Sequence, residues 1–283
     1  MQTNNLNTIS VDFTPTYRAL LGETEKMELY LVGTGGTGSA LADALARILY
    51  HAQQKGKEIS LTLIDPDTVE EKNIGRQRFC KAEVGWPKAS ALALRLNAAF
   101  GLDLRATTKP FALDMVIQGY SSRTTKKLVI GCVDNYRPRQ ALAEVVERGN
   151  GHIWWLDVGN AHHNGNVYIG NHIYANQLRV DEALHLCNGL PSPAVQDPAL
   201  LLPDPPAAPH LSCADLTLRE EQSLMINTMM AAIAANYCYQ WVIQGEITSM
   251  STAVTLNPPT MTSQQITREA MQAAFDRYQE EDR

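Results

Sequence analysis

Four segments in the first half of the chain carry residues suited to holding a nucleotide polyphosphate. The earliest is GTGGTGS, in which Gly33, Gly35 and Gly38 have the spacing GxGxxG. Glycine lets the backbone turn sharply and approach a phosphate closely where a helix begins. Gly36 and the hydroxyl of Ser39 belong to the same turn. The pattern favours a phosphate site over a tight turn without a ligand, but it suits NAD and ATP equally.

The segment IDPDTVEEKNIGRQRF combines carboxylates, amides and an arginine. Asp65 ends an apolar run, where a carboxylate can bind ribose hydroxyls. Arg76 offers a planar fork of donors for phosphate oxygens. We assign three further polar residues of this segment to the site: Asp67, Asn73 and Gln77. A dehydrogenase has no use for this series, and a charged surface loop does not explain it, so the segment favours ATP.

Lys88 and Asp134 complete the set. Lys88, in EVGWPKA, begins a predicted helix, where the ammonium and the helix N-terminus both favour a phosphate. Asp134, in GCVDNYRPRQAL, follows an apolar run, and a carboxylate at the carboxyl end of a central strand faces the ligand crevice. Mg²⁺ beside phosphates needs one or two such oxygens. Together the four segments predict an ATP site with Asp134 as a metal ligand.

The elements that position these residues predict a mostly parallel, doubly wound α/β sheet of the Rossmann-like type. Apolar runs typical of buried strands alternate with helical patterns, as expected of βαβ units. The predicted strands are residues 27–33, 58–65, 104–108, 126–134 and 152–159, and the predicted helices are residues 40–54, 88–99 and 137–149.

The second half of the chain predicts a different arrangement. Residues 166–173 begin an antiparallel extension, and proline-rich residues about 187–215 predict a long crossover loop before a buried helix. We expect an N-terminal arm over residues 1–25, one domain over residues 26–283, and a C-terminal helix over about 264–283.

The composition excludes several classes of function. The chain has 283 residues and a net charge of −6, without a basic run for nucleic acid. The first residues lack a signal peptide's features, and Asn227, Asn236 and Gln240 interrupt the longest apolar stretch, so we expect a soluble cytoplasmic protein without a membrane span. The five cysteines are scattered, with no CxxC pair, which predicts neither a disulfide framework nor a zinc site.

In their order and spacing, the four segments resemble the ThiF/MoeB family, the bacterial relatives of ubiquitin-activating enzymes. The resemblance spans about residues 31–159 and resumes near residue 213. It implies a homodimeric transferase that uses ATP and Mg²⁺ to adenylate the C-terminal carboxylate of a ubiquitin-like or sulfur-carrier-like protein. The implied roles are ribose binding by Asp65, triphosphate binding by Asn73, Arg76, Gln77 and Lys88, and Mg²⁺ binding by Asp134.

More narrowly, the chain resembles the ThiF-like member of the PRTRC gene clusters. These clusters also encode a ubiquitin-like protein, a conjugating-enzyme-like protein and a JAB-type peptidase. The resemblance therefore implies the first of these as substrate and the second as a partner.

The resemblance leaves a later thioester step open. In the family a cysteine at the end of the crossover can accept the activated acyl group, and Cys213 occupies that place, near Arg219 and before a helix. A small buried cysteine is the alternative. Cys187 is the reserve candidate, whereas Cys132 and Cys238 lie in apolar runs and are expected in the core.

Three other functions remain as alternatives. A small-molecule adenylating enzyme, such as a cyclase acting on modified tRNA, is disfavoured by the low positive charge. An NAD-dependent oxidoreductase leaves Arg76, Lys88 and Asp134 unexplained. A degenerate family member could act only as a binding module. Family members also use an N-terminal arginine that reaches a partner subunit's ATP, and Arg18 is the candidate here.

Overall fold

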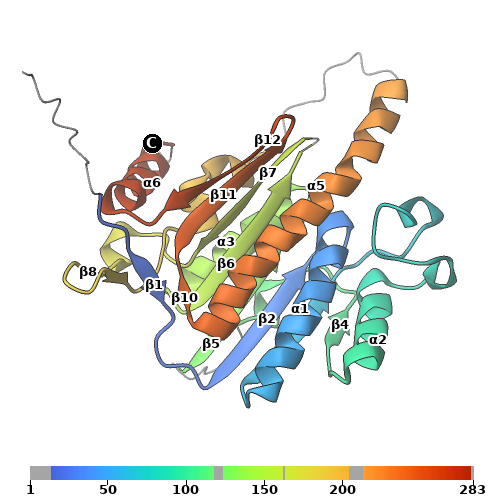
Figure 1. The fold of residues 1–283 in the computed structure, drawn as a ribbon, viewed down its shortest axis with the longest axis horizontal. Helices are drawn as coiled ribbons and strands as arrows, with labels where there is room; N and C mark the ends of the chain where they lie inside the picture. The colour runs from blue at the N-terminus through green and yellow to red at the C-terminus, as the bar shows by residue number, and fades with distance from the viewer. Residues whose placement is uncertain (1–13, 118–123, 162, 204–212, 282–283) are drawn as a thin grey trace, which may run out of the picture.

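A single eight-stranded sheet organises the molecule (Figure 1). The computed structural model describes residues 14–117, 124–161, 163–203 and 213–281, with the backbone alone for residues 213–224. The strand order is β12-β11-β7-β6-β5-β2-β3-β4. The strands are β2 (Lys26–Val32), β3 (Glu58–Ile64), β4 (Arg105–Thr107), β5 (Thr125–Gly131), β6 (Ile153–Asn160), β7 (Asn164–Gly170), β11 (Ser249–Leu256) and β12 (Pro259–Gln265).

The sheet is parallel from β4 to β6 and antiparallel from β7 to β12. This confirms the predicted Rossmann-like sheet with an antiparallel extension. In the parallel half Val32 pairs with both Ile64 and Gly131, so β2, β3 and β5 end level with one another. The segments that follow these strands therefore emerge side by side at one edge of the sheet, which is where the predicted site residues lie.

Helices cover both faces of the sheet (Figure 1). One face packs against α1 (Gly36–Gln54), α2 (Lys88–Phe100) and α5 (Cys213–Tyr239). The other packs against α3 (Tyr136–Arg148), α4 (Pro193–Gln196) and α6 (Arg268–Glu281). Short 3-10 turns lie between these elements: η1 (Glu71–Asn73), η2 (Lys81–Glu83), η3 (Leu113–Met115), η4 (Ala175–Gln177) and η5 (Pro198–Leu201).

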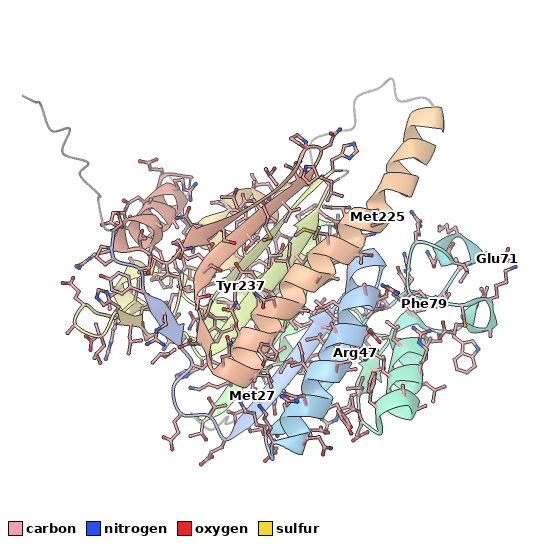
Figure 2. All side chains as sticks on the ribbon, viewed as in Figure 1. Met27, Arg47, Glu71, Phe79, Met225 and Tyr237 are labelled. Carbon is pink, nitrogen blue, oxygen red and sulfur yellow. The ribbon has the colours of Figure 1, made fainter. Side chains whose placement is uncertain are left out.

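The helix α5 lies beside α1 over the centre of the sheet (Figure 2). Its residues Ile226, Met230, Ala234 and Tyr237 recur every three or four positions and are buried, so they form one core-facing stripe. The hydroxyl of Tyr237 lies 2.8 Å from Thr252 Oγ1, which ties the helix to β11. The chain continues into a π-helical turn (Gln240–Gln244). Among the described residues, no helix is long and apolar enough to cross a membrane.

A second, smaller sheet was not expected from the sequence. Its order is β10-β1-β9-β8, formed by Glu246–Ile247, Arg18–Leu20, Leu186–Cys187 and Val180–Asp181. The strand β1 lies within the segment expected to be an irregular arm. Tyr17, Ala19 and Leu21 alternate toward the core and are buried. Three apolar residues are too short a run to predict a strand.

Two other segments differ from their expected boundaries. The predicted crossover loop contains β9, α4 and η5, whose prolines occupy first helical positions, where a missing amide costs nothing. The C-terminal helix begins at Arg268 rather than about residue 264, because β12 extends to Gln265. All seven residues of β12 are exposed, so no apolar alternation marks this edge strand.

Candidate active site

A cavity of about 740 Å³ opens at the carboxyl edge of the parallel strands. From β2 the chain passes to α1 on one face, and from β5 it passes to α3 on the other. This is the topological switch point at which open α/β sheets bind ligands, and the volume suits a small molecule. Nine predicted site residues line it: Gly33, Gly35, Gly36, Asp65, Asp67, Arg76, Gln77, Lys88 and Asp134.

The glycine turn is shaped by close backbone approach. Gly33 has φ +85°, and a Cβ there would lie 2.5 Å from the Cys132 carbonyl oxygen. A Cβ on Gly38 would lie 1.9 Å from the Gly33 oxygen, so Gly38 lets α1 pack against the end of β2. Gly38 and Ser39 do not line the cavity. The Ser39 hydroxyl is buried and accepts from the Arg78 amide at 3.0 Å, which joins the turn to the next segment.

The two aspartates after β3 differ in what their carboxylates contact. Asp65 is buried, and its Oδ2 accepts from the Thr34 amide at 2.6 Å and the Thr34 hydroxyl at 2.8 Å. Its Oδ1 accepts from the Asp67 amide at 2.9 Å. The side chain of Asp67 is 66% exposed. Both oxygens of Asp65 therefore stabilise the backbone at the cavity floor, whereas Asp67 presents an accessible carboxylate.

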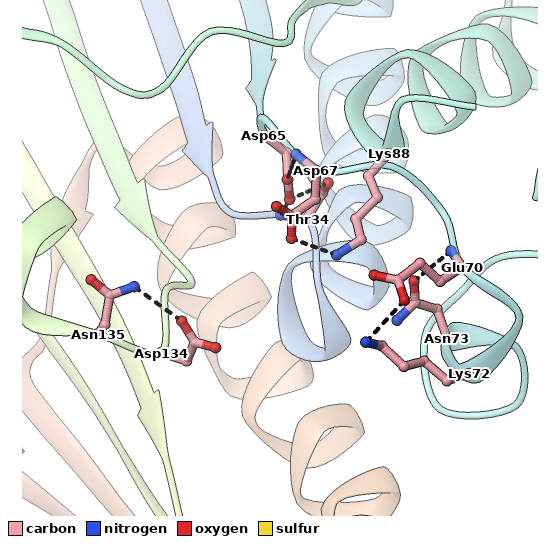
Figure 3. A network of polar contacts seen from close by, with 9 residues as sticks. All are labelled: Thr34, Asp65, Asp67, Glu70, Lys72, Asn73, Lys88, Asp134 and Asn135. Carbon is pink, nitrogen blue, oxygen red and sulfur yellow. Dashed lines mark hydrogen bonds and ion pairs between the residues drawn. The ribbon is translucent and has the colours of Figure 1, made fainter. Parts of the chain in front are cut away.

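Lys88 brings a buried cation to the same place (Figure 3). It is the first residue of α2, its side chain is 9% exposed, and its Nζ lies 2.9 Å from Asp67 Oδ2. Pro87 precedes it in an extended conformation and sets the direction in which the helix begins. The pair places a positive and a negative group in the same cavity as the glycine turn, which suits a ligand that carries both phosphate and hydroxyl groups.

The predicted site residues in the loop around η1 differ in whether they line the cavity. Asn73 is buried, does not line the cavity, and accepts from the Glu70 amide at 2.8 Å, so it shapes the loop (Figure 3). Arg76 lines the cavity, and its Nε donates to the Lys72 carbonyl at 3.2 Å. Gln77 also lines the cavity, and its buried Oε1 has no hydrogen-bond partner among the described residues. An unpaired buried acceptor favours a ligand that donates a hydrogen bond.

Asp134 lies across the glycine turn from Lys88 (Figure 3). It is exposed, and its Oδ1 accepts from the Asn135 amide group at 3.3 Å. Asn135 in turn caps α3 by accepting from the Arg137 amide. An exposed carboxylate at the end of a central strand, next to a phosphate-sized turn, has the chemistry of a magnesium ligand.

Asn227 of α5 is a lining residue that the sequence reasoning missed as part of the site. Its Oδ1 accepts from Thr37 Oγ1 at 3.0 Å and from Asn160 Nδ2 at 2.5 Å. A Cβ on Gly36 would lie 2.3 Å from Asn227 Nδ2, so this amide packs directly on the glycine turn. The sequence did offer a signal, because Asn227 is a polar residue inside an otherwise apolar stretch. In the sequence analysis, this residue served only as evidence against a membrane span.

Arg139, from the RPRQ segment, also lines the cavity and was missed. Its Nε donates to both oxygens of the fully buried Asp157 at 3.2 Å, and its Nη2 donates to the Val133 carbonyl at 2.9 Å. Burial raises the pKa of Asp157 to about 6, although the Arg139 guanidinium acts in the opposite direction. The pair fixes a cation at the α3 side of the cavity.

The remaining wall of the cavity is apolar and was also not predicted. Pro110 and Phe111 come from the loop after β4, and Pro138 and Ala141 come from α3. An aromatic ring between small apolar groups can hold a flat heterocycle.

The cysteines do not gather at this cavity. Cys213 is the first residue of α5, and its side chain lies outside the described part of the structure. Cys187 is buried in β9, in the smaller sheet, and its Sγ lies 3.7 Å from the Arg18 carbonyl oxygen. Burial raises the pKa of Cys187 to about 11, which disfavours a thiolate. Cys238 is buried as expected, whereas Cys132 is partly exposed at the cavity.

Arg18, the candidate for reaching a partner subunit's nucleotide, has a partner in its own chain. Its Nη1 lies 2.8 Å from Glu246 Oε2 across the β1–β10 pair. Its side chain is more than half exposed, so this ion pair contributes little.

The fold defines an α/β protein of the Rossmann-like class with a cavity at its topological switch point. The model of the ThiF family matches residues 17–275, and the chain belongs to that family. The ubiquitin-like modifier-activating enzyme 5 of Aedes aegypti is 32% identical over 123 residues, which are 40% of this chain and 29% of that protein. The enzyme of the same name from Drosophila virilis is 30% identical over 140 residues, 46% and 32% of the two chains.

Solved structures of two other proteins share the fold. PaaA has a TM-score of 0.53 at 15% identity, and E. coli MccB, crystallised with ATP, has a TM-score of 0.54 at 14% identity. Each alignment covers 86% of this chain and 65% of the other. The chain thus spans about a third or less of the modifier-activating enzymes and about two thirds of these structures. At such low identity the structural likeness shows the fold alone.

Proposed function

We propose that the protein adenylates the C-terminal carboxylate of a ubiquitin-like or sulfur-carrier-like protein, using ATP. Family membership supports ATP-dependent activation of a carboxylate. The observation that carries the proposal is the carboxyl-edge cavity, whose lining combines a glycine turn with Lys88 and Asp134. A dehydrogenase does not need a buried lysine and an opposed carboxylate at its phosphate turn.

Each lining residue has a role in this proposal. Asp67, with its accessible carboxylate, accepts from the ribose hydroxyls, whereas Asp65 holds the Thr34 turn in place. Lys88 and Arg76 contact the phosphates. Phe111 and its apolar neighbours hold the adenine. The unpaired amide oxygen of Gln77 accepts a hydrogen bond from a donor group of the nucleotide.

The donor set also suits Mg²⁺, which prefers one or two carboxylates beside substrate phosphates. Asp134 would hold the ion, and Asp67 is a second exposed carboxylate in the lining of the same cavity. Mg²⁺ supplies charge neutralisation on the polyphosphate. The residues of the chain position the reactants and surround the developing negative charge with cations, and such preorganised charge is the main source of rate in phosphoryl transfer.

The reaction itself is a displacement at phosphorus. A carboxylate oxygen of the substrate attacks the α-phosphorus of ATP, and a new O–P bond forms. The bond between the α-phosphorus and the bridging oxygen of the β-phosphate breaks, so pyrophosphate leaves with that electron pair. Lys88, Arg76 and Arg139 surround the phosphates and neutralise the charge that builds up on them.

A thioester step on Cys213 remains part of the proposal. The thiolate would attack the acyl carbon, AMP would leave, and the thiol proton would pass to solvent. The helix α5 begins at Cys213, and a helix N-terminus favours a thiolate. Cys187 is a poor reserve, because it is buried in the smaller sheet and its pKa is raised.

The finer assignments are also proposals. We propose that the substrate is the ubiquitin-like protein of a PRTRC gene cluster, with a conjugating-enzyme-like protein as partner and a cytoplasmic homodimer as the working form. A short protein ending in glycine, encoded beside this gene, would support the first of these.

The test is exchange of labelled pyrophosphate into ATP. The enzyme is incubated with ATP, MgCl₂ and the ubiquitin-like protein. In the matched control, the ubiquitin-like protein carries a C-terminal amide, which cannot be adenylated. Exchange that depends on the free carboxylate supports the proposal. ATP binding without exchange would identify a binding module, and binding of NAD in preference to ATP would overturn the proposal.

The thioester is tested separately. We expect a thiol-sensitive adduct on a non-reducing gel, which Cys213→Ala abolishes while pyrophosphate exchange continues, because adenylation needs no thiol. An adduct that survives in Cys213→Ala and disappears in Cys187→Ala would reverse the assignment. No adduct with any variant would mean that the enzyme stops at the adenylate.

A further inference from the structure

A second cavity, of about 560 Å³, lies at the opposite edge of the sheet. It is bounded by the beginnings of β5 and β6, the end of β7 and the strands β1, β8 and β9 of the smaller sheet. Figure 1 shows β1 and β8 to the left of the molecule, away from the amino end of α1. The parallel strands are seven residues long, so about 20 Å of sheet separates this amino-edge cavity from the nucleotide cavity.

The lining of the amino-edge cavity is mostly basic where it is charged. Its cationic lining residues are Lys126 and Arg179, Asp181 is the one acidic lining residue, and the imidazoles of His152 and His172 also line it. The Oδ1 of Asp181 accepts from the amides of Ala183 and Leu184, so this carboxylate is committed to a turn. Glu23 lies close enough to Lys126 to raise its pKa, but burial is the larger effect and lowers it. This charge balance favours an anion.

His172 is a buried polar group facing this cavity. It is 4% exposed, and neither ring nitrogen has a hydrogen-bond partner among the described residues. Two amide side chains lie close enough to the ring to raise its pKa, those of Gln177 and Asn188. Gln177 Nε2 also donates to Asn150 Oδ1 at 2.9 Å, and Asn188 Nδ2 donates to the Gln177 carbonyl at 3.1 Å. Burial lowers the pKa of His172 to about 4, so at neutral pH the ring offers one donor and one acceptor.

The ring of His172 is held in a tight backbone cradle. A Cβ on Gly151 would lie 2.6 Å from His172 Cε1, and a Cβ on Gly189 would lie 2.6 Å from its Nε2. The chain therefore encloses the ring on two sides and leaves its polar atoms unpaired. A buried polar pair without partners is rare in folded proteins and costs free energy unless a ligand or water completes it.

The other walls are apolar. Leu20, Leu21, Trp154, Val180 and Leu186 line the cavity. We propose that the amino-edge cavity binds a small carboxylate with an apolar, hydroxyl-bearing body, its carboxylate at Lys126 and Arg179 and its hydroxyl at His172. The volume lies within the range of small-molecule sites. This inference does not depend on the proposed adenylation, because the two cavities share no lining residue.

The test uses three matched probes with the full chain: 4-hydroxybenzoate, benzoate and 4-hydroxybenzyl alcohol. Binding is followed by isothermal titration calorimetry and by the ring C–H proton resonances of the histidines, with the His172 signals assigned from the His172→Gln variant. We expect saturable binding of 4-hydroxybenzoate that shifts the His172 signals. Benzoate should bind roughly tenfold more weakly, since it lacks the hydroxyl, and the uncharged alcohol more weakly still.

Variants separate the two contacts. Lys126→Met should weaken the binding of both carboxylate probes and leave the binding of the alcohol unchanged. His172→Leu should remove the preference for 4-hydroxybenzoate over benzoate, and His172→Gln should restore part of it. Asp134→Ala, which alters only the nucleotide cavity, should leave all three affinities unchanged.

Two results would overturn the inference. One is an absence of saturable binding to the unmodified chain at millimolar concentrations, which does not depend on any variant folding. The other is binding that leaves the His172 signals unshifted or that Asp134→Ala weakens, since either would place the probe elsewhere. Failure of pyrophosphate exchange has no bearing on these results.

Discussion

Lys88 and Lys127 allow a matched comparison between a lysine of the cavity and a lysine of the framework. The side chain of each is 9% exposed, and each pairs with a carboxylate: Lys88 with Asp67 at 2.9 Å, and Lys127 with Glu28 at 3.7 Å. Lys127 also donates to the Val116 carbonyl at 2.6 Å, away from the nucleotide cavity. The perturbation is replacement of each by methionine, which keeps the length and apolar stem.

Lys88→Met should mainly lower the reaction rate, whereas Lys127→Met should mainly lower the stability of the fold. At an effective dielectric of about 20, a pair of charges is worth about 4 kcal/mol at 4 Å, but Asp67 is mostly exposed, so the Lys88 pair stabilises the fold by about 1 kcal/mol or less. Removing Lys127 leaves the buried Val116 carbonyl without this donor, which costs about 1–3 kcal/mol. A lost transition-state contact at Lys88 should lower the rate about a hundredfold or more.

The assay combines thermal unfolding with ATP binding and pyrophosphate exchange. Lys88→Met should lower Tm by about 2–4 °C and lose most of the exchange. Lys127→Met should lower Tm by more and keep the exchange rate of the folded fraction. If Lys88→Met binds ATP and exchanges at the normal rate while Tm falls steeply, then Lys88 is a framework residue and the site reasoning is wrong.

The other predictions concern five positions at or near the cavity. Asp134→Ala should abolish pyrophosphate exchange with Tm unchanged, because the exposed carboxylate bonds only its neighbour's amide group in the described structure; normal exchange would remove it from the mechanism. Asp65→Asn should destabilise the fold measurably in urea, whereas Asp67→Asn should lower ATP affinity in calorimetry with little effect on stability. Gly38→Ala should cost about 3 kcal/mol or more in urea unfolding, because its Cβ would meet backbone oxygen at 1.9 Å. Burial raises the pKa of Asp157 to about 6, so the folded state binds this proton more tightly than the unfolded chain does. The free energy of unfolding of the unmodified protein, measured relative to that of Asp157→Asn, should therefore fall as the pH rises from about 4 to about 6.

The parallel half of the fold was predictable because its strands are buried on both faces. A strand such as β2 appears as a short apolar run ended by glycine, and such runs are distinctive. By contrast, β1 has three residues and β12 has no buried residue, so neither produces a pattern. Their pairing depends on neighbours distant in the sequence, which local periodicity does not report.

The candidate site divides in the same way. Residues that follow the end of a strand, such as Asp65 and Asp134, could be placed at one edge because parallel strands end together. Which of the two carboxylates, Asp65 or Asp67, is accessible could not be predicted, because it depends on the Thr34 amide reaching Asp65. Asn227 contacts Thr37 from 190 positions away, and no spacing rule covers that distance.

The contact between Asn227 and the glycine turn bears on how the chain can be divided. All four segments that predict the nucleotide site end by residue 142, so a fragment ending after β6 would contain every motif. That fragment would lack α5, which packs on α1 and presses an amide against Gly36. Its glycine turn and the apolar face of α1 would then meet solvent. A shortened form of this protein intended to keep the cavity intact should therefore retain α5 and extend through β11.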